Sequence, residues 1–208
     1  MKVAKNIILI AIMGVVAYNS VYFKKLESVK AASAATLFHA TQYAQTFWNE
    51  KLMPNLDKAI DIVDLENQLS TDTARIFDTY SHALGIGNLR YFLVKGKGII
   101  TSINENDVYV EPDSSKQSIK IATEYIFGNE VRDATGLINI NEFNNTMDFN
   151  NVSAEINKII RERVLPSFKS NVRKENRVEF VGAIELNKEH LDLSHIEVIP
   201  VQIKILPN

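Results

Sequence analysis

The segment FGNEVRDATGLI, residues 127–138, gathers two acids, an asparagine and an arginine into one short window. Arg132 carries a planar guanidinium, which can hold a carboxylate or a pair of sugar hydroxyls through two parallel hydrogen bonds. A second polar group precedes the first expected strand, in LGIGNLRY. Together these two segments supply the candidate ligand-binding residues, which are Asn88, Arg90, Asn129, Glu130, Arg132 and Asp133.

The same acids permit a different chemistry, general acid and base catalysis by a pair of carboxylates. Glu130 with Asp133, or Glu50 with either, is the pair that a hydrolase would use. Such an enzyme requires a concave site with two convergent carboxylates, one of which has a raised pKa. Acidic loops commonly offer such pairs for solvation alone, so no catalytic residue is assigned.

A structural role for the loop competes with ligand binding. Gly128 and Gly136 allow positive φ, and asparagine and aspartate side chains bond neighbouring backbone amides. Ordered polar loops need such structural hydrogen bonds more often than they contact ligands. We therefore expect Arg132 to pair with the acids of its own loop in preference to a ligand.

Metal ions and cofactors are not expected. The chain has no cysteine, and its four histidines show no ligand spacing on one helix. It also lacks the GxSxG elbow, the GxxxxGK[ST] phosphate loop and the GxGxxG fingerprint. With a formal net charge of −2, it has no basic excess to attract nucleic acid, and none is expected as a partner.

The N-terminus resembles a membrane-targeting segment. An uncharged apolar run over residues 7–18 is flanked by lysines on both sides, and it extends to Phe23 at about the minimum length of a span. Small residues at the distance expected for signal-peptide cleavage are lacking. We expect an uncleaved anchor in the cytoplasmic membrane over residues 3–23, in preference to a cleaved signal or a buried core helix.

Helical periodicity follows the anchor. Apolar residues between Leu37 and Trp48 predict an amphipathic helix ending near Met53 and Pro54, and Leu56, Ile60 and Val63 continue the period for about two turns. A further helix should begin at Thr71 or Asp72 and end at Gly85. The aromatic stripe of Phe47, Trp48 and Phe77 is expected to pack in the core rather than to form a ligand site.

From Arg90 the pattern alternates as in strands. The expected strands are residues 90–103, with Gly96 and Gly98 as kinks, 107–112, 118–125, 177–186 and 196–206. A helix from Val152 to Pro166 separates the third strand from the fourth. This order favours an α+β fold with a five-stranded OB-like β-barrel. An open α+β sheet with helices on one face is the alternative.

These elements divide the chain into three expected parts. Residues 1–23 form the anchor, residues 24–86 a helical segment packed on the barrel, and residues 87–208 the barrel domain. Neither a repeat nor a flexible Gly/Ser linker separates the last two.

Several unusual segments, in order along nearly the whole chain, resemble a bacterial family of predicted periplasmic lipoproteins called DUF2291. They are VYFKKLE, FWNEKLMPNLDKA, LGIGNLRYFLVKGKG, FGNEVRDATGLININEF, FNNVSAEIN, RVEFVGAIELN and VIPVQIKIL. A lipoprotein needs a cysteine after its signal sequence, and this chain has none. A retained transmembrane anchor is therefore expected in place of the lipid.

The resemblance implies a cell-envelope protein without an assigned activity, whose relatives are often encoded near sugar ABC transporter components. We accordingly expect a single-pass membrane protein whose soluble domain faces the periplasm or the outside. Its function would be that of a tethered accessory protein that binds a small polar ligand such as a sugar, or a component of an ABC transporter. A cell-envelope hydrolase using loop carboxylates is the alternative.

Overall fold

The structure is a computed structural model that describes residues 6, 13–16, 38–115 and 117–207. Residues His39–Asn208 form one compact unit, with which the following description is concerned. Its helices are α3 (Ala40–Thr46), η1 (Phe47–Leu52), η2 (Met53–Lys58), α4 (Ile62–Thr71), α5 (Thr73–Tyr80), α6 (Glu130–Asp133), η3 (Ile140–Glu142), α7 (Thr146–Ile159), η4 (Ile160–Val164) and α8 (Leu165–Asn171). Its strands are β1 (Ile60–Asp61), β2 (Ser81–His82), β3 (Leu89–Ile103), β4 (Asp107–Pro112), β5 (Ile119–Ala122), β6 (Arg177–Asn187) and β7 (Glu197–Ile205).

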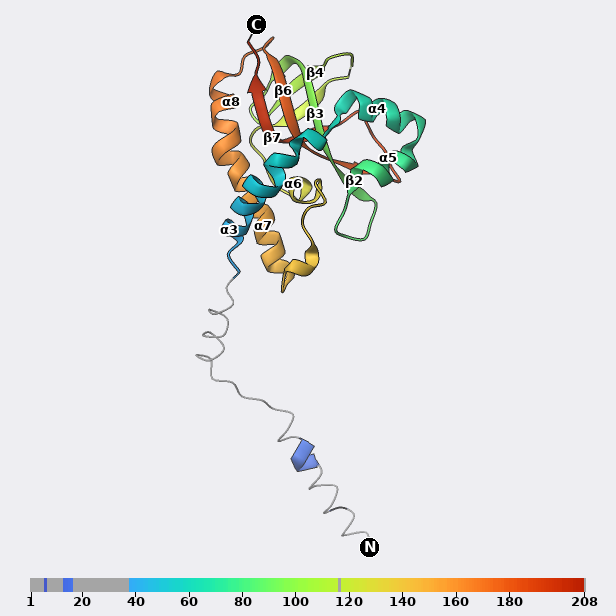
Figure 1. Cartoon of the computed structure of the whole chain (residues 1–208), viewed down its shortest axis with the longest axis vertical. Helices are drawn as coiled ribbons and strands as arrows, with labels where there is room; N and C mark the ends of the chain where they lie inside the picture. Colours follow the sequence, from blue (N-terminus) through green and yellow to red (C-terminus); the bar gives the residue numbers. More distant parts are fainter. Residues whose placement is uncertain (1–5, 7–12, 17–37, 116, 208) are drawn as a thin grey trace. The chain divides into compact units, whose positions relative to one another are not determined.

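The strands form one mixed sheet, and β3 organises it (Figure 1). β3 pairs with β6 over most of its length and with β4 at its far end, while β5 pairs with β4 and β7, and β7 with β6. These pairings follow a circuit through five strands. The sheet is nevertheless not a clean five-stranded barrel, because β1 and β2 also pair with β3, and β5 meets β7 through only two residue pairs. The expected mixed α+β fold is confirmed in this coarser form.

Gly98 lets β3 pair with both of its neighbouring strands, β4 and β6. It is paired with Val178 of β6 and with Pro112 of β4. A Cβ atom at this position would lie 2.2 Å from the backbone oxygen of Glu111, closer than real Cβ contacts allow. The glycine that the sequence predicts as a kink is therefore required by the close approach of another backbone.

The core fills the space between the sheet and its helices. Phe92 and Phe180 are completely buried, and Phe77 of α5 meets Phe92 edge to face with ring centroids 5.2 Å apart. α4 and α5 pack against β3, while η4 and α8 pack against β7 (Figure 1). Phe47, Trp48 and Phe77 are all buried, as their helical spacing predicts.

Pro166 does not end the long helix, contrary to the sequence-based expectation. The helix passes through the π-helical turn η4 and continues as α8 to Asn171, with the proline in the first turn of α8. Proline has no N–H to donate and crowds the preceding turn of a regular α-helix. A wider π-helical turn directly before it avoids breaking the helix.

The helices before β3 also differ from expectation. Leu56 lies in η2, Ile60 in β1 and Val63 in α4, so their common spacing does not belong to one helix. Asp72 does cap α5, because its side chain accepts a hydrogen bond from the Arg75 amide. The helix ends at Tyr80 rather than Gly85, since the following residues pair with β3 as β2.

The expected anchor over residues 3–23 lies largely outside the described residues, as do residues 24–37 of the expected helical segment. Among the residues that the structure does describe, none belongs to a helix with the length and apolar character needed to cross a membrane.

Candidate functional site

A cavity of about 340 Å³ is lined by residues of α6, of α7 and of the connection from β2 to β3. Four of the six residues expected to bind a ligand line it, from segments more than forty positions apart in the chain. They are Asn88, Asn129, Arg132 and Asp133. Its other walls are Tyr91 of β3, Ile140, Thr146, Phe149, Asn150 and residues 83–87 and 89.

The polar centre of the cavity wall is an ion pair between Arg132 and Asp133. The Arg132 Nε donates to Asp133 Oδ1 at 2.6 Å, and its Nη2 donates to Asp133 Oδ2 at 3.0 Å. Both side chains are 4% exposed. Such two-point geometry is the strongest arrangement available to an arginine and a carboxylate.

Aromatic rings support this ion pair from α7 and from the chain before it. The Arg132 guanidinium carbon lies 3.5 Å from the centroid of the Phe149 ring, which favours a positive charge over its face. Phe149 in turn packs against Phe143 with centroids 5.1 Å apart, and Phe143 against Tyr43 of α3 at 5.2 Å. The guanidinium is therefore held by a carboxylate at its edge and by a ring on its face.

Arg132 keeps hydrogen-bonding capacity in spite of these contacts. A guanidinium has five N–H groups. Besides the two bonds to Asp133, Nη1 makes one long bond of 3.5 Å to the Phe149 carbonyl oxygen. One N–H on each terminal nitrogen is left without a partner in the described part of the chain, although the side chain is almost fully buried.

The loop that carries Arg132 is fixed to α7. Asn157 donates from Nδ2 to the Gly128 carbonyl oxygen at 3.0 Å, and the Ser153 hydroxyl donates to Asn129 Oδ1 at 3.1 Å. Gly128 and Gly136 have positive φ, as the composition of the loop predicts. Arg132 pairs with the acid of its own loop, as expected, and it also lines a cavity.

The structure separates Arg90 and Glu130 from the cavity wall. Arg90 lies on β3 opposite Leu186 of β6 and is not among the lining residues. Glu130 is also absent from the wall, and its Oε2 is buried without a hydrogen-bond partner in the described chain. Burial raises the pKa of the Glu130 carboxyl above its ordinary value, and repulsion from Glu185 adds to this rise.

Sequence reasoning missed Tyr91, Thr146, Phe149 and Asn150 as parts of the wall. Phe149 has the spacing of a core residue of α7, and it is indeed 6% exposed. The available signal was the asparagine-rich stretch before and within α7, because asparagine side chains are frequent where a surface is polar. Only the fold brings this stretch beside residues 83–88.

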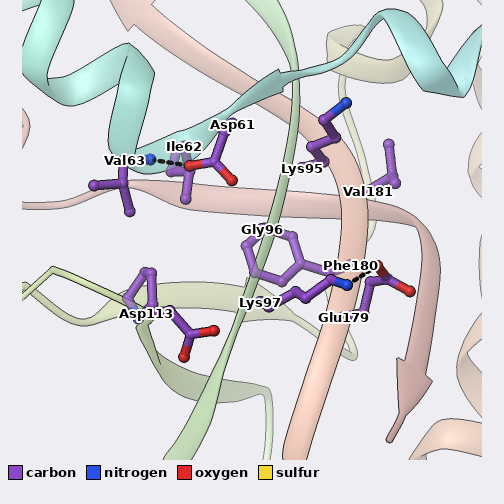
Figure 2. Close-up of a pocket in the computed structure, with 11 residues that line it drawn as sticks. Asp61, Ile62, Val63, Lys95, Gly96, Lys97, Asp113, Glu179, Phe180 and Val181 are labelled. Atoms are coloured by element: carbon purple, nitrogen blue, oxygen red, sulfur yellow. Dashed lines mark hydrogen bonds and ion pairs between the residues drawn. The ribbon is translucent and has the colours of Figure 1, made fainter.

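A larger cavity, of about 410 Å³, opens between the start of α4 and strands β3 and β6 (Figure 2). Its charged side chains are already engaged. Lys97 pairs with Glu179 at 3.0 Å, and Asp61 caps α4 by accepting from the Val63 amide at 2.9 Å (Figure 2). Asp113 pairs with Arg177. The smaller cavity is therefore the better candidate, because its buried guanidinium retains unused donors.

Metal binding receives no support from the described residues, which contain no group of three or more histidine, aspartate or glutamate side chains able to hold an ion. The cavity instead combines amides, hydroxyls and aromatic faces with a neutral ion pair. Such a wall suits a polar ligand of low net charge.

Comparison with known proteins agrees with this architecture. A crystal structure of an OB-fold protein from Thermotoga maritima MSB8 is similar, with 27% identity and a TM-score of 0.72, over 82% of this chain and 100% of that chain. The OB-type order of strands inferred from the sequence thus has a structural counterpart. No curated protein sequence matches the chain.

The family comparison covers almost the whole chain. The model described as "Predicted periplasmic lipoprotein (DUF2291)" matches residues 11–204, which include every element of the fold apart from the last residue of β7. The resemblance inferred from the sequence segments is confirmed, and the chain belongs to the DUF2291 family.

Proposed function

We propose that this protein is a non-catalytic binding protein of the cell envelope, and that the cavity at Arg132 holds a small, polyhydroxylated, uncharged ligand such as a monosaccharide. The observation that carries the proposal is a guanidinium with 4% exposure that lines the cavity. Among the described residues, each of its terminal nitrogens retains one N–H without a partner. Leaving buried donors unpaired costs free energy, which a ligand with acceptor oxygens would recover.

The charge of the wall selects the class of ligand. Asp133 neutralises Arg132, so the wall does not present a net positive charge from this pair. An anion would gain little from a compensated arginine, whereas a hydroxyl can both accept from Arg132 and donate to an amide oxygen. Asn88, Asn150 and Thr146 supply such groups around the opening.

The apolar part of the wall suits the same ligand. Tyr91, Phe149 and Ile140 lie among the polar groups. Sugars expose C–H faces between their hydroxyls, so a wall that alternates rings and amides matches them better than a purely polar one. A volume of about 340 Å³ is at the lower end of small-molecule sites, in keeping with a single sugar ring.

We place this binding domain on the outer side of the cytoplasmic membrane, tethered by residues 3–23. The family description as a periplasmic lipoprotein supports an envelope location. The apolar segment with flanking lysines supports the tether. The partner we propose is a component of an ABC transporter for the same class of ligand, to which the tether would keep the domain close.

The geometry of the cavity supports the hydrolase alternative less well than it supports a binding function. It needs two carboxylates at one concave site, one with a raised pKa. Glu130 has the raised pKa but does not line the cavity, and Asp133 lines it but is committed to Arg132 by two hydrogen bonds. Glu50 is exposed on η1 and does not line this cavity. We therefore develop the binding function.

A thermal-shift screen of the compact unit, His39–Asn208, against monosaccharides, polyols, sugar acids and free amino acids tests the proposal. Uncharged sugars or polyols should raise the melting temperature in proportion to the logarithm of their concentration. Stabilisation by sugar acids alone would contradict the assigned class of ligand. Stabilisation by none of the four classes would contradict the proposed function itself.

A further inference from the structure

A second feature of the surface lies after β5, and none of its residues lines the cavity described above. Tyr125 and Phe127 are 62% and 66% exposed, although aromatic rings of this size are usually buried. Their rings lie nearly parallel, with an interplanar angle of 23° and centroids 6.3 Å apart. The two side chains therefore form a small aromatic platform that faces solvent.

The platform is held rigidly by the residues between and beside its rings. Ile126, which separates the two aromatics, is completely buried. Its carbonyl oxygen accepts a hydrogen bond from Arg161 of η4 at 2.5 Å. On the other side of Tyr125, the amides of Thr123 and Glu124 donate to the Asn106 carbonyl oxygen at 3.0 and 3.2 Å. Because the backbone is fixed at both ends, the exposure of the rings is built into the fold.

A polar cleft adjoins the platform. It has a volume of about 370 Å³ and is lined by Thr123, Glu124, Arg161, Leu165, Pro166, Lys169 and Ser170. Arg161 connects the two features, because its guanidinium carbon lies 6.0 Å from the centroid of the Phe127 ring. The cleft is lined by two hydroxyls, a carboxylate and two cations. Glu124 and Lys169 pair with each other, and Arg161 donates to the Ile126 carbonyl oxygen, so a ligand would share these groups with the protein.

We propose that the platform and this cleft form a binding site for an oligosaccharide. Flat aromatic faces accept the C–H faces of pyranose rings, and neighbouring hydroxyls and charged groups bond the ring hydroxyls. The site is distinct from the cavity at Arg132 and takes a chain of sugars rather than a single small molecule. The proposal rests on the two exposed rings and on the polar groups beside them.

The mixed charge of the cleft argues for sugar over a lipid surface. Glu124 lies beside Tyr125 and pairs with Lys169, which leaves Arg161 as the one uncompensated charge among the described residues that line the cleft. Anionic membrane surfaces attract clusters of lysine and arginine, and a single cation is weak attraction by comparison. The two rings also lie nearly parallel and close together, rather than projecting separately. A surface that inserts into headgroups would place cations without an acid beside its aromatics.

The test uses the folded domain and three tetrasaccharides, a neutral glucan, an N-acetylated one and a uronic acid polymer fragment, each titrated by calorimetry. At least one should bind, and Phe127→Ala and Tyr125→Ala should each weaken it roughly three- to tenfold. Tyr125→Phe should bind like the wild type, because stacking needs the ring and not the hydroxyl. Met147→Ala removes an apolar side chain that is 72% exposed elsewhere and should leave affinity unchanged.

Failure of all three tetrasaccharides to bind, or equal affinity in a Tyr125→Ala, Phe127→Ala double variant, overturns the proposal. So does a Phe127-dependent dimer in light scattering, or Phe127-dependent sedimentation with anionic vesicles, in the absence of tetrasaccharide binding. Asn150→Ala at the other cavity should leave tetrasaccharide affinity unchanged. The two proposals can therefore fail separately.

Discussion

Arg132 and Asp133 are neighbours in the chain, yet their side chains meet edge to edge in a buried two-point ion pair, with Nε and Oδ1 2.6 Å apart. Adjacent residues in a long helix do not face each other. Here the helix α6 comprises only Glu130–Asp133, so the chain is free to turn both side chains inward. The pair gives the cavity a polar wall without a net charge.

Breaking this pair from one side should destabilise the domain strongly. Arg132→Met leaves the Asp133 carboxylate buried alone, and Asp133→Leu leaves the guanidinium alone. We expect each to lower the free energy of unfolding by about 3–5 kcal/mol, and the double variant to lose less than the sum. Urea denaturation at pH 7 measures this cycle. Additive effects would show that the two side chains are not coupled.

The pairing of β3 with β4 should depend on Gly98. Alanine there would bring Cβ within 2.2 Å of the Glu111 backbone oxygen, and a backbone atom cannot move aside as a side chain can. We expect Gly98→Ala to cost about 1–3 kcal/mol or more of the free energy of unfolding. Gly85→Ala is the matched control, because a Cβ there meets nothing within 4 Å. Equal unfolding midpoints for the two variants would contradict the close approach.

The buried carboxyl of Glu130 should make stability depend on pH. Burial, and then repulsion from Glu185, raises the pKa of Glu130 in the folded state above the ordinary value of 4.5. The folded state therefore binds the proton more tightly, and the stability of the wild type falls as pH rises from about 4.5 through the raised pKa.

Glu130→Gln removes this titration. We expect the variant to be more stable than the wild type near pH 8 and the difference to shrink toward pH 4. Melting temperatures across this pH range measure it. A difference that is independent of pH would mean that the carboxyl is not buried as described.

Much of the fold could be predicted from local patterns. The alternation of β3, β4, β6 and β7 and the cap at Asp72 follow from neighbouring residues in the chain. At Gly98 the sequence predicts a kink, but the approach of the Glu111 backbone depends on the pairing of two strands. The π-helical turn before Pro166 could not be predicted, because the apolar periodicity of the segment does not distinguish a π-helical turn from the end of the helix at the proline. The short strand β2 could not be predicted either, because its two residues form a strand only through their pairing with β3.

The site was predictable to the extent that its polar groups lie within one loop. Asn129, Arg132 and Asp133 follow each other closely, and the sequence singles them out together with Asn88. Arg90 and Glu130 belong to the same two polar segments, but they do not line the cavity. The register of β3 turns Arg90 away from the wall, and the turn of α6 does the same for Glu130. Phe149 and Asn150 could not be assigned, because helical periodicity alone does not show which neighbour a helix face will meet.

The proposed tether predicts different fractionation for two forms of the chain. Full-length protein expressed in a bacterial host should sediment with membranes and resist extraction by high salt, whereas a form beginning at His39 should remain in the supernatant. Cell fractionation with detergent extraction measures both. If expression of the full-length chain gave a soluble product of reduced mass, the N-terminal segment would have been cleaved, and the retained anchor would be contradicted.

The most direct measurement of the central claim is calorimetric titration of the strongest uncharged ligand from the screen into three proteins, the wild type, Asn150→Ala and Asn151→Ala. Both asparagines are exposed on α7, but only Asn150 lines the cavity. Loss of one hydrogen bond to the ligand should weaken binding to Asn150→Ala roughly three- to tenfold. Asn151→Ala should match the wild type. Equal affinity of the two variants would contradict binding at the Arg132 cavity.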